Sequence, residues 1–531
     1  SYAMSGLLND NNEQQNSIYE YNGTGGNDGD QADYASLGSN SYAKVNVNQG
    51  NIQQDPDEGP VVVPKAIMDP SISDNLLQAT PSKPQNYAVW TPRGASLYLQ
   101  DKFQAGSIKG SIFTLIICIV GAGALSLPWA FRVSGLLLGT ILLLLASGFT
   151  FLSLHFLVYA GLYIQERPSY RNLALKAGGK YLAGYTSINL MCNLFGTTVS
   201  YFVALGGILD LVYSVVFNTK NSIYRELVFG VALVVVFPLS LMRSMNALRY
   251  GSLIGITCSG YLCLVVIIDY FRLCDDNSVF EGDDIERHTC FWKSNFSLSW
   301  DELVHFTPNG FLSSFPIFVF AYSCQPNVLP IYVELQRRSV RRMHKVIRRS
   351  LYFAAILYVF VGMFGYLTFM DGTCGNVLQN DFKKHPEVIV SAVTICISCM
   401  FTLPMCVFAF RENLTVFTIN KIQVSWIPHT LITFGMIAVC STIAATVSQL
   451  NVVLGFLGST TNPSVAYFLP NLFFIKLVPK EKAPKRWWLA VISMVVLLGL
   501  SAASFIFQIW ALFDDSLNPA TSCSQAQNIE G

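Results

Sequence analysis

Long, almost uninterrupted runs of apolar residues recur along this chain from about residue 108 onwards. A helix that crosses the roughly 30 Å hydrocarbon core of a bilayer needs about 20 apolar residues. Eleven runs are long enough, and each predicts a membrane-spanning helix. They cover residues 108–133, 136–163, 183–214, 226–242, 251–271, 310–333, 350–370, 388–410, 427–447, 450–475 and 487–512.

The N-terminal hundred residues have a different pattern. They contain no long apolar run and are rich in Asn, Asp, Gly, Ser and Gln. Low hydrophobicity combined with net negative charge predicts disorder. The sequence therefore predicts a disordered cytosolic tail over 1–104, an all-α, eleven-helix membrane domain over 105–515 and a short extracytosolic tail over 516–531.

Composition supports a membrane protein. Hydrophobic residues make up 52% of the chain and charged residues only 13%, about half the usual share of a soluble protein. The net charge of +1 conceals an asymmetry, because residues 1–100 hold 11 acidic and 4 basic side chains and the remainder is basic. We expect membrane lipids as partners and no nucleic acid.

The distribution of basic residues predicts the orientation. Cytoplasmic loops of membrane proteins carry an excess of Lys and Arg. With the tail inside, the inner loops hold 20 basic residues and the outer loops 8. The N-terminus is therefore predicted to be cytosolic and the C-terminus extracytosolic, in the plasma membrane or an endolysosomal or vacuolar membrane.

The loop over 272–309 then faces the extracytosolic side. It contains Cys274, Cys290 and the sequon that begins at Asn295. An oxidising, glycosylating compartment favours a Cys274–Cys290 disulfide and a glycan on Asn295. The alternative for the cysteines is two unpaired thiols.

Ionisable residues inside the predicted spans are few. His155 in the second span is the clearest, and we interpret it as a packed side chain rather than a proton relay. No paired histidine and acid occur at the interval that a membrane-embedded acyltransferase needs, which argues against that activity.

The first and sixth spans each contain a helix-breaking segment. The first reads Gly121-Ala122-Gly123 ahead of Pro128, and the sixth reads Phe320 to Ser323 ahead of Pro326. Glycine tolerates unusual backbone angles and proline removes a donor. Breaks at corresponding positions of two sets of five spans indicate a transporter's binding site. The alternatives are close packing through small residues and a simple proline kink.

Several motifs resemble one known family. The stretch Cys324-Gln325-Pro326-Asn327-Val328-Leu329-Pro330-Ile331-Tyr332, and Phe364-Gly365-Tyr366-Leu367-Thr368-Phe369 after it, are similar to the sodium-coupled neutral amino acid transporters of the amino acid/auxin permease family. The resemblance implies a LeuT-type fold, which has two inverted five-helix repeats and an eleventh helix, together with alternating access and no enzymatic activity. It also implies a disulfide in the outer loop between spans five and six.

The resemblance also implies site residues. It places the substrate carboxylate at Gly121, Ala122 and Gly123. It places the substrate amino group near Phe320, Ala321, Tyr322 and Ser323. Thr402 matches a hydroxyl associated with sodium, but Ile117 stands where sodium-coupled members carry Asn. Isoleucine can offer a hard cation only its backbone carbonyl, so coupling to Na⁺, to H⁺ or to neither stays open.

The sequence therefore predicts a secondary active transporter that moves small neutral amino acids, with no cofactor and with Na⁺ or H⁺ as the candidate coupling ions. The alternative is an endolysosomal amino acid sensor whose N-terminal tail binds a cytosolic partner.

Overall fold

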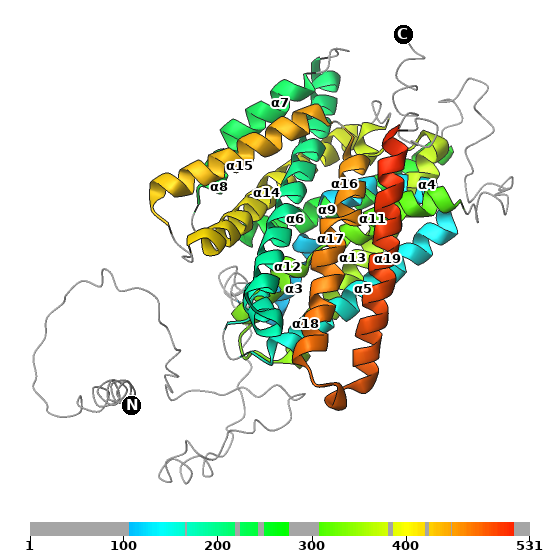
Figure 1. Cartoon of the computed structure of the whole chain (residues 1–531). Coiled ribbons are helices and arrows are strands. Elements are labelled where there is room, and N and C mark those ends of the chain that lie inside the picture. The colour runs from blue at the N-terminus through cyan, green and yellow to red at the C-terminus, as the bar shows by residue number, and fades with distance from the viewer. Residues whose placement is uncertain are drawn as a thin grey trace, which may run out of the picture. The chain divides into compact units, whose positions relative to one another are not determined.

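The computed structural model describes residues 106–164, 167–217, 223–242, 249–275, 307–380, 386–419, 424–447 and 449–513. All regular structure in these residues is helical, as Figure 1 shows. The predicted all-α class is therefore confirmed. The predicted N-terminal and C-terminal tails, the Cys274 side chain, Cys290 and Asn295 lie outside the described residues, so the predictions about them stay predictions.

Among the described residues, seven helices are long and apolar enough to cross a bilayer. They are α5 (Leu136–Gly161), α6 (Tyr170–Phe217), α9 (Arg249–Asp275), α13 (Val340–Phe369), α14 (Pro386–Ile419), α15 (Trp426–Thr446) and α19 (Pro484–Phe513). The first expected span is a bent pair: α3 (Ile108–Ile119) meets η3 (Ala122–Ser126) and α4 (Leu127–Ser134) at an angle of 45°.

The other three expected spans are each divided into shorter helices. The fourth contains α7 (Tyr224–Val231), η4 (Ala232–Val236) and α8 (Phe237–Ser240). The sixth contains α11 (Pro308–Ala321) and α12 (Gln325–Glu334). The tenth contains α16 (Leu450–Ser459), α17 (Thr461–Pro463), η8 (Ser464–Phe468) and α18 (Leu469–Leu477). Every expected span thus coincides with helix, but the count of eleven spans stays a prediction.

Proline and glycine residues mark several of the places where helices start or bend. Pro128 lies in the first turn of α4 and Pro326 in the first turn of α12, where a missing N–H costs nothing. In α6, Gly178 and Gly179 leave the helical conformation, and Gly179 has a φ of 72°, which favours glycine. The apolar run that predicted a span from 183 begins just after this kink.

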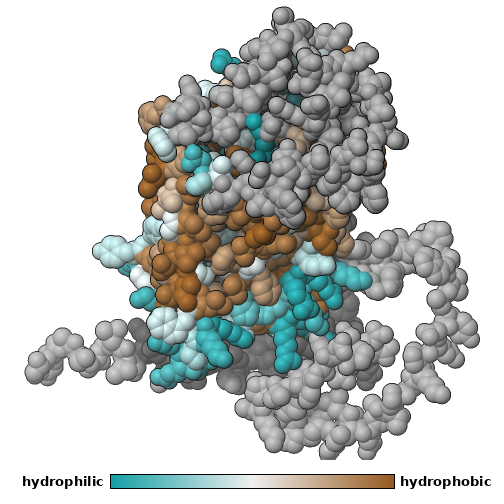
Figure 2. All heavy atoms as spheres, turned by 90° about the vertical axis from the view of Figure 1, so that its right-hand side faces the viewer, coloured by the Kyte–Doolittle hydropathy of each residue, from teal (hydrophilic) through white to brown (hydrophobic). Residues whose placement is uncertain are grey.

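The outside of the helical domain is apolar. Figure 2 shows a broad band of hydrophobic residues on one face, with hydrophilic residues gathered below it. Large side chains on the lipid-accessible helices stay exposed, including Leu431 on α15 and Val495 on α19. Such a surface is suited to hydrocarbon rather than water. The chain is an integral membrane protein.

Cys374, between α13 and α14, is disulfide-bonded. The other cysteines whose side chains the structure describes are free. The side chain of Cys274 and the whole of Cys290 lie outside the described residues, so the predicted Cys274–Cys290 disulfide stays a prediction.

Candidate functional site

The breaks of the first and sixth spans lie against each other. A Cβ added to Gly123 would be 3.0 Å from the Cα of Ala321. From the other side, the Tyr358 hydroxyl of α13 lies 2.7 Å from the Ile119 carbonyl and 2.9 Å from the Ala321 carbonyl. These carbonyls end α3 and α11, so one side chain holds both broken ends together.

A partly enclosed cavity of about 70 Å³ lies between these breaks, α6 and α14. A cavity needs roughly 10–15 Å³ of such volume to hold one water, so this cavity holds about five waters. That space is similar to the volume of a small amino acid. Among its lining residues are eight of the predicted ones: Ile117, Gly121, Ala122, Gly123, Phe320, Ala321, Ser323 and Thr402. Their role in binding stays a prediction.

The break in the first span leaves two backbone donors free. The Gly121 N–H bonds the Ile119 carbonyl and the Ala124 N–H bonds the Gly121 carbonyl. Within the described residues, the N–H groups of Ala122 and Gly123 have no hydrogen-bond partner. They begin η3, and unpaired donors at a helix start attract an anion.

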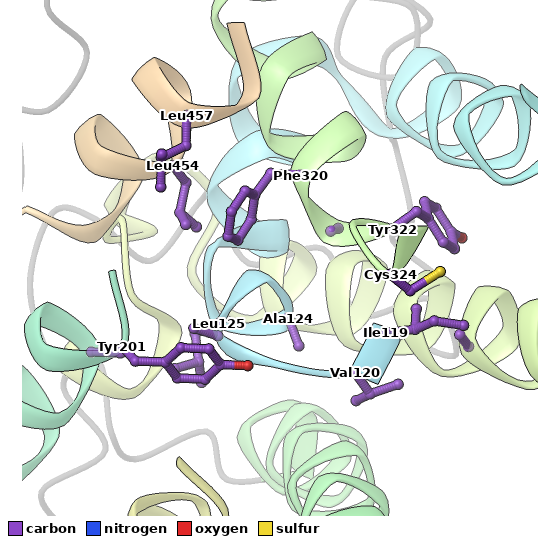
Figure 3. Close-up of a cluster of buried hydrophobic side chains, with 14 of the residues drawn as sticks. Ile119, Val120, Ala124, Leu125, Tyr201, Phe320, Tyr322, Cys324, Leu454 and Leu457 are labelled. Atoms are coloured by element: carbon purple, nitrogen blue, oxygen red, sulfur yellow. The ribbon is translucent and has the colours of Figure 1, made fainter. Parts of the chain in front are cut away.

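Tyr201 of α6 faces the same break. A Cβ at Gly121 would lie 2.3 Å from the Tyr201 hydroxyl oxygen, so only glycine fits there without movement. In Figure 3 the Tyr201 hydroxyl points toward the turn that joins α3 to η3. A neutral hydroxyl donor therefore lies close to the two free amides.

Tyr322 is the predicted residue that the structure does not bring to the cavity. It is fully buried, and its ring meets the ring of Tyr358 edge-on with centroids 5.3 Å apart. Figure 3 shows Tyr322 directed away from Phe320. Tyr322 therefore packs behind the break.

Ser323 connects the cavity to the tenth span. Its hydroxyl donates to the Asn462 Oδ1 atom at 2.5 Å. On the opposite wall, the Asn193 Nδ2 atom of α6 lies 3.4 Å from the Thr461 Oγ1 atom. The junction of α16 and α17 thus contacts two walls of the cavity.

The predicted cation ligands are only partly available. The Thr402 hydroxyl donates to the Ser398 carbonyl at 2.9 Å, which leaves its lone pairs for another partner. The Ile117 side chain packs into α9, since a Cβ at Gly255 would lie 2.2 Å from the Ile117 Cδ1 atom. In the described part of the chain, no group of three or more His, Cys, Asp or Glu side chains could hold a metal ion.

Beside the breaks, apolar side chains pack tightly. Leu125, Leu454 and Phe320 belong to the buried hydrophobic core there (Figure 3). The Leu457 side chain would lie 2.1 Å from a Cβ on Gly196, so α16 packs closely on α6. This apolar packing borders the cavity at Phe320, which is also one of the lining residues.

His155 lies elsewhere and does not line the cavity. Its ring stacks on His344 of α13, with centroids 4.2 Å apart and planes 17° from parallel. It is a packed side chain next to the rings of Tyr159 and Phe156.

Sequence reasoning did not assign a role to several further lining residues on α6, α12 and α14, including Asn193, Thr197, Tyr201, Asn327, Met405 and Cys406. A usable signal was present, because Asn193 and Thr197 are polar residues one turn apart inside an apolar span. Asn462 carried no such signal, since its partners lie more than a hundred residues away.

The family is decided by a comparison of the sequence with known families. The model of the "Transmembrane amino acid transporter protein" family matches residues 104–513. The chain belongs to this family. The match confirms the predicted amino acid/auxin permease family and implies an amino acid substrate and a membrane environment, but it does not single out the sodium-coupled branch.

Solved structures also resemble the chain at 12% identity. A manganese transporter of Eremococcus coleocola aligns over 83% of this chain and 94% of its own, with a TM-score of 0.49. Mhp1, a nucleobase-cation-symport-1 family transporter in a closed conformation, aligns over 78% of this chain and 95% of its own, with a TM-score of 0.47. An inward-facing form of Mhp1 aligns over 76% and 90%, also with a TM-score of 0.47.

Proposed function

We propose that this family member is a secondary transporter that carries small neutral amino acids through the cavity by alternating access. The supporting observation is the pair of free amides, Ala122 and Gly123, that face a cavity also bordered by the ends of α3 and α11. Free N–H groups suit a carboxylate, and carbonyls at helix ends suit an ammonium group. An α-amino acid carries both groups on one carbon.

Charge supports a neutral side chain. The residues that line the cavity include no Asp, Glu, Lys, Arg or His. A charged substrate side chain would be buried there without a counter-charge, at a high cost in free energy. Alanine-like and glutamine-like substrates satisfy this limit, and the volume of the cavity favours the smaller ones.

Three modes of transport have to be distinguished: coupling to a Na⁺ gradient, coupling to an H⁺ gradient, and transport without a coupling ion. The Thr402 hydroxyl is an oxygen ligand in reach of the cavity, which supports Na⁺. Ile117 adds no side-chain oxygen, which weakens that mode. No carboxylate lines the cavity to carry a proton.

The test is uptake of radiolabelled alanine by proteoliposomes under Na⁺ and H⁺ gradients imposed separately. We expect saturable uptake that unlabelled neutral amino acids inhibit and that lysine and glutamate do not. Tight alanine binding without flux under any gradient would contradict transport and favour the sensor.

A further inference from the structure

The side chain of Asn462 supplies a hydrogen bond that the break in the sixth span removes from the backbone. In an unbroken helix, the Val319 carbonyl would accept from the N–H of Ser323. Here that N–H bonds the Phe320 carbonyl at 2.9 Å instead. The Asn462 Nδ2 atom bonds the Val319 carbonyl at 3.2 Å, and its Oδ1 atom accepts from the Ser323 hydroxyl.

The orientation of the Asn462 amide follows from its partners. A carbonyl oxygen only accepts hydrogen bonds, so the amide nitrogen must face Val319 and the amide oxygen must face Ser323. Since that oxygen carries no proton, the Ser323 hydroxyl has to donate its only proton to it. Asn462 is fully buried, so water cannot take over this role.

Ser323 lines the cavity, whereas Asn462 does not. With its proton committed to Asn462, Ser323 offers the cavity lone pairs alone. We propose that Asn462 is a positioning residue that makes Ser323 an acceptor-only group, so that this subsite takes an N–H donor such as the substrate ammonium. The proposal rests on the proposed function, because it assigns one end of the same amino acid.

An acceptor-only Ser323 discriminates between an amino acid and its keto acid. Alanine presents N–H donors at the α-carbon, whereas pyruvate presents only an acceptor oxygen there. Two acceptors facing each other in a buried site leave both unsatisfied. The wild-type protein should therefore bind alanine and not pyruvate.

The experiment measures the dissociation constants of alanine and pyruvate with the purified full chain in detergent. Asn462→Leu frees the Ser323 proton to point into the cavity. It should reduce the preference for alanine over pyruvate by roughly 10- to 100-fold. Asn462→Asp keeps an acceptor for Ser323 but removes the donor to Val319, and it should retain the preference.

The matched control is Asn471→Leu in the same span. Asn471 is also buried and bonds a serine hydroxyl, Ser493 Oγ at 3.2 Å, but it does not line the cavity. This variant should keep the wild-type preference. A purely structural role for Asn462 predicts instead that its Leu and Asp variants lose affinity for both ligands alike.

An unchanged preference in folded Asn462→Leu would overturn the proposal. If that variant does not fold, Ser323→Ala serves as the second test, because loss of the acceptor should lower the preference by a similar factor, and an unchanged ratio overturns the proposal equally. Failure of the wild-type protein to bind alanine contradicts the proposed function itself, so the two failures are distinguishable.

Discussion

Gly123 and Ala321 meet through bare backbone, because a Cβ on Gly123 would lie 3.0 Å from the Ala321 Cα. The first of these residues lies in the break of the first span and the second ends α11 in the sixth. A side chain at 123 would separate the two breaks that border the cavity. The binding geometry therefore depends on the absence of that side chain.

Gly123→Val should abolish alanine uptake, because the valine side chain forces the two breaks apart. It should not prevent folding, because residue 123 lies in the short helix η3 and not in one of the long helices. Uptake by proteoliposomes and elution as a single detergent-solubilised species measure the two effects. Gly148→Val is the control, since a Cβ at Gly148 meets nothing within 4 Å. Normal uptake by Gly123→Val would remove the basis for the site.

Gly121 and Tyr201 should behave as a coupled pair. In Gly121→Ala the new Cβ would lie 2.3 Å from the Tyr201 hydroxyl oxygen, and overpacking of this kind costs about 1–3 kcal/mol. Adding Tyr201→Phe removes that oxygen and leaves the ring carbon at 3.3 Å, so most of the lost stability should return. Thermal unfolding of the four proteins gives the coupling energy. Additive effects would show that the contact is not formed.

Asn193→Asp should admit cationic substrates. Asn193 lines a cavity without charged side chains, so a carboxylate there supplies the counter-charge that lysine lacks in the wild-type protein. We expect lysine to inhibit alanine uptake in this variant. Asn189→Asp, about one turn away on α6 and outside the cavity lining, is the control. Lysine inhibition that is equal in both variants would point to a surface effect.

Arg411 should contribute to stability rather than to transport. It is buried in α14, although its sequence position suggested an inner loop. Its guanidinium donates to the Ser240 carbonyl at 2.9 Å, where α8 ends, and to Thr433 Oγ1 at 2.8 Å. Arg411→Met removes charged hydrogen bonds worth about 1.5–3 kcal/mol each. A lowered melting temperature with alanine affinity unchanged is expected, and an unaltered melting temperature would contradict this.

The helices were predictable because apolar runs report directly on the length of a span. The breaks were predictable as well, since Gly121 and Gly123 tolerate non-helical backbone angles and Pro326 cannot donate to a continuing helix. The direction of each side chain within a break was not. Tyr322 follows Ala321 immediately, yet Ala321 lines the cavity and Tyr322 does not.

Contacts between residues that are far apart along the chain could not be predicted from the pattern of apolar and polar residues. Tyr201 and Asn462 reach the breaks from spans that are distant along the chain, and neither belongs to a local motif. Cys374 was overlooked for the same reason, because a disulfide depends on proximity in space and spacing along the chain does not report it.

The most direct test of the central claim is uptake of radiolabelled alanine into proteoliposomes that contain the wild-type chain, Gly123→Val or Gly148→Val. The account predicts saturable uptake by the wild-type and Gly148→Val proteins and none above empty liposomes for Gly123→Val. Equal uptake by all three proteins, or none by the wild-type protein under either imposed gradient, would contradict it.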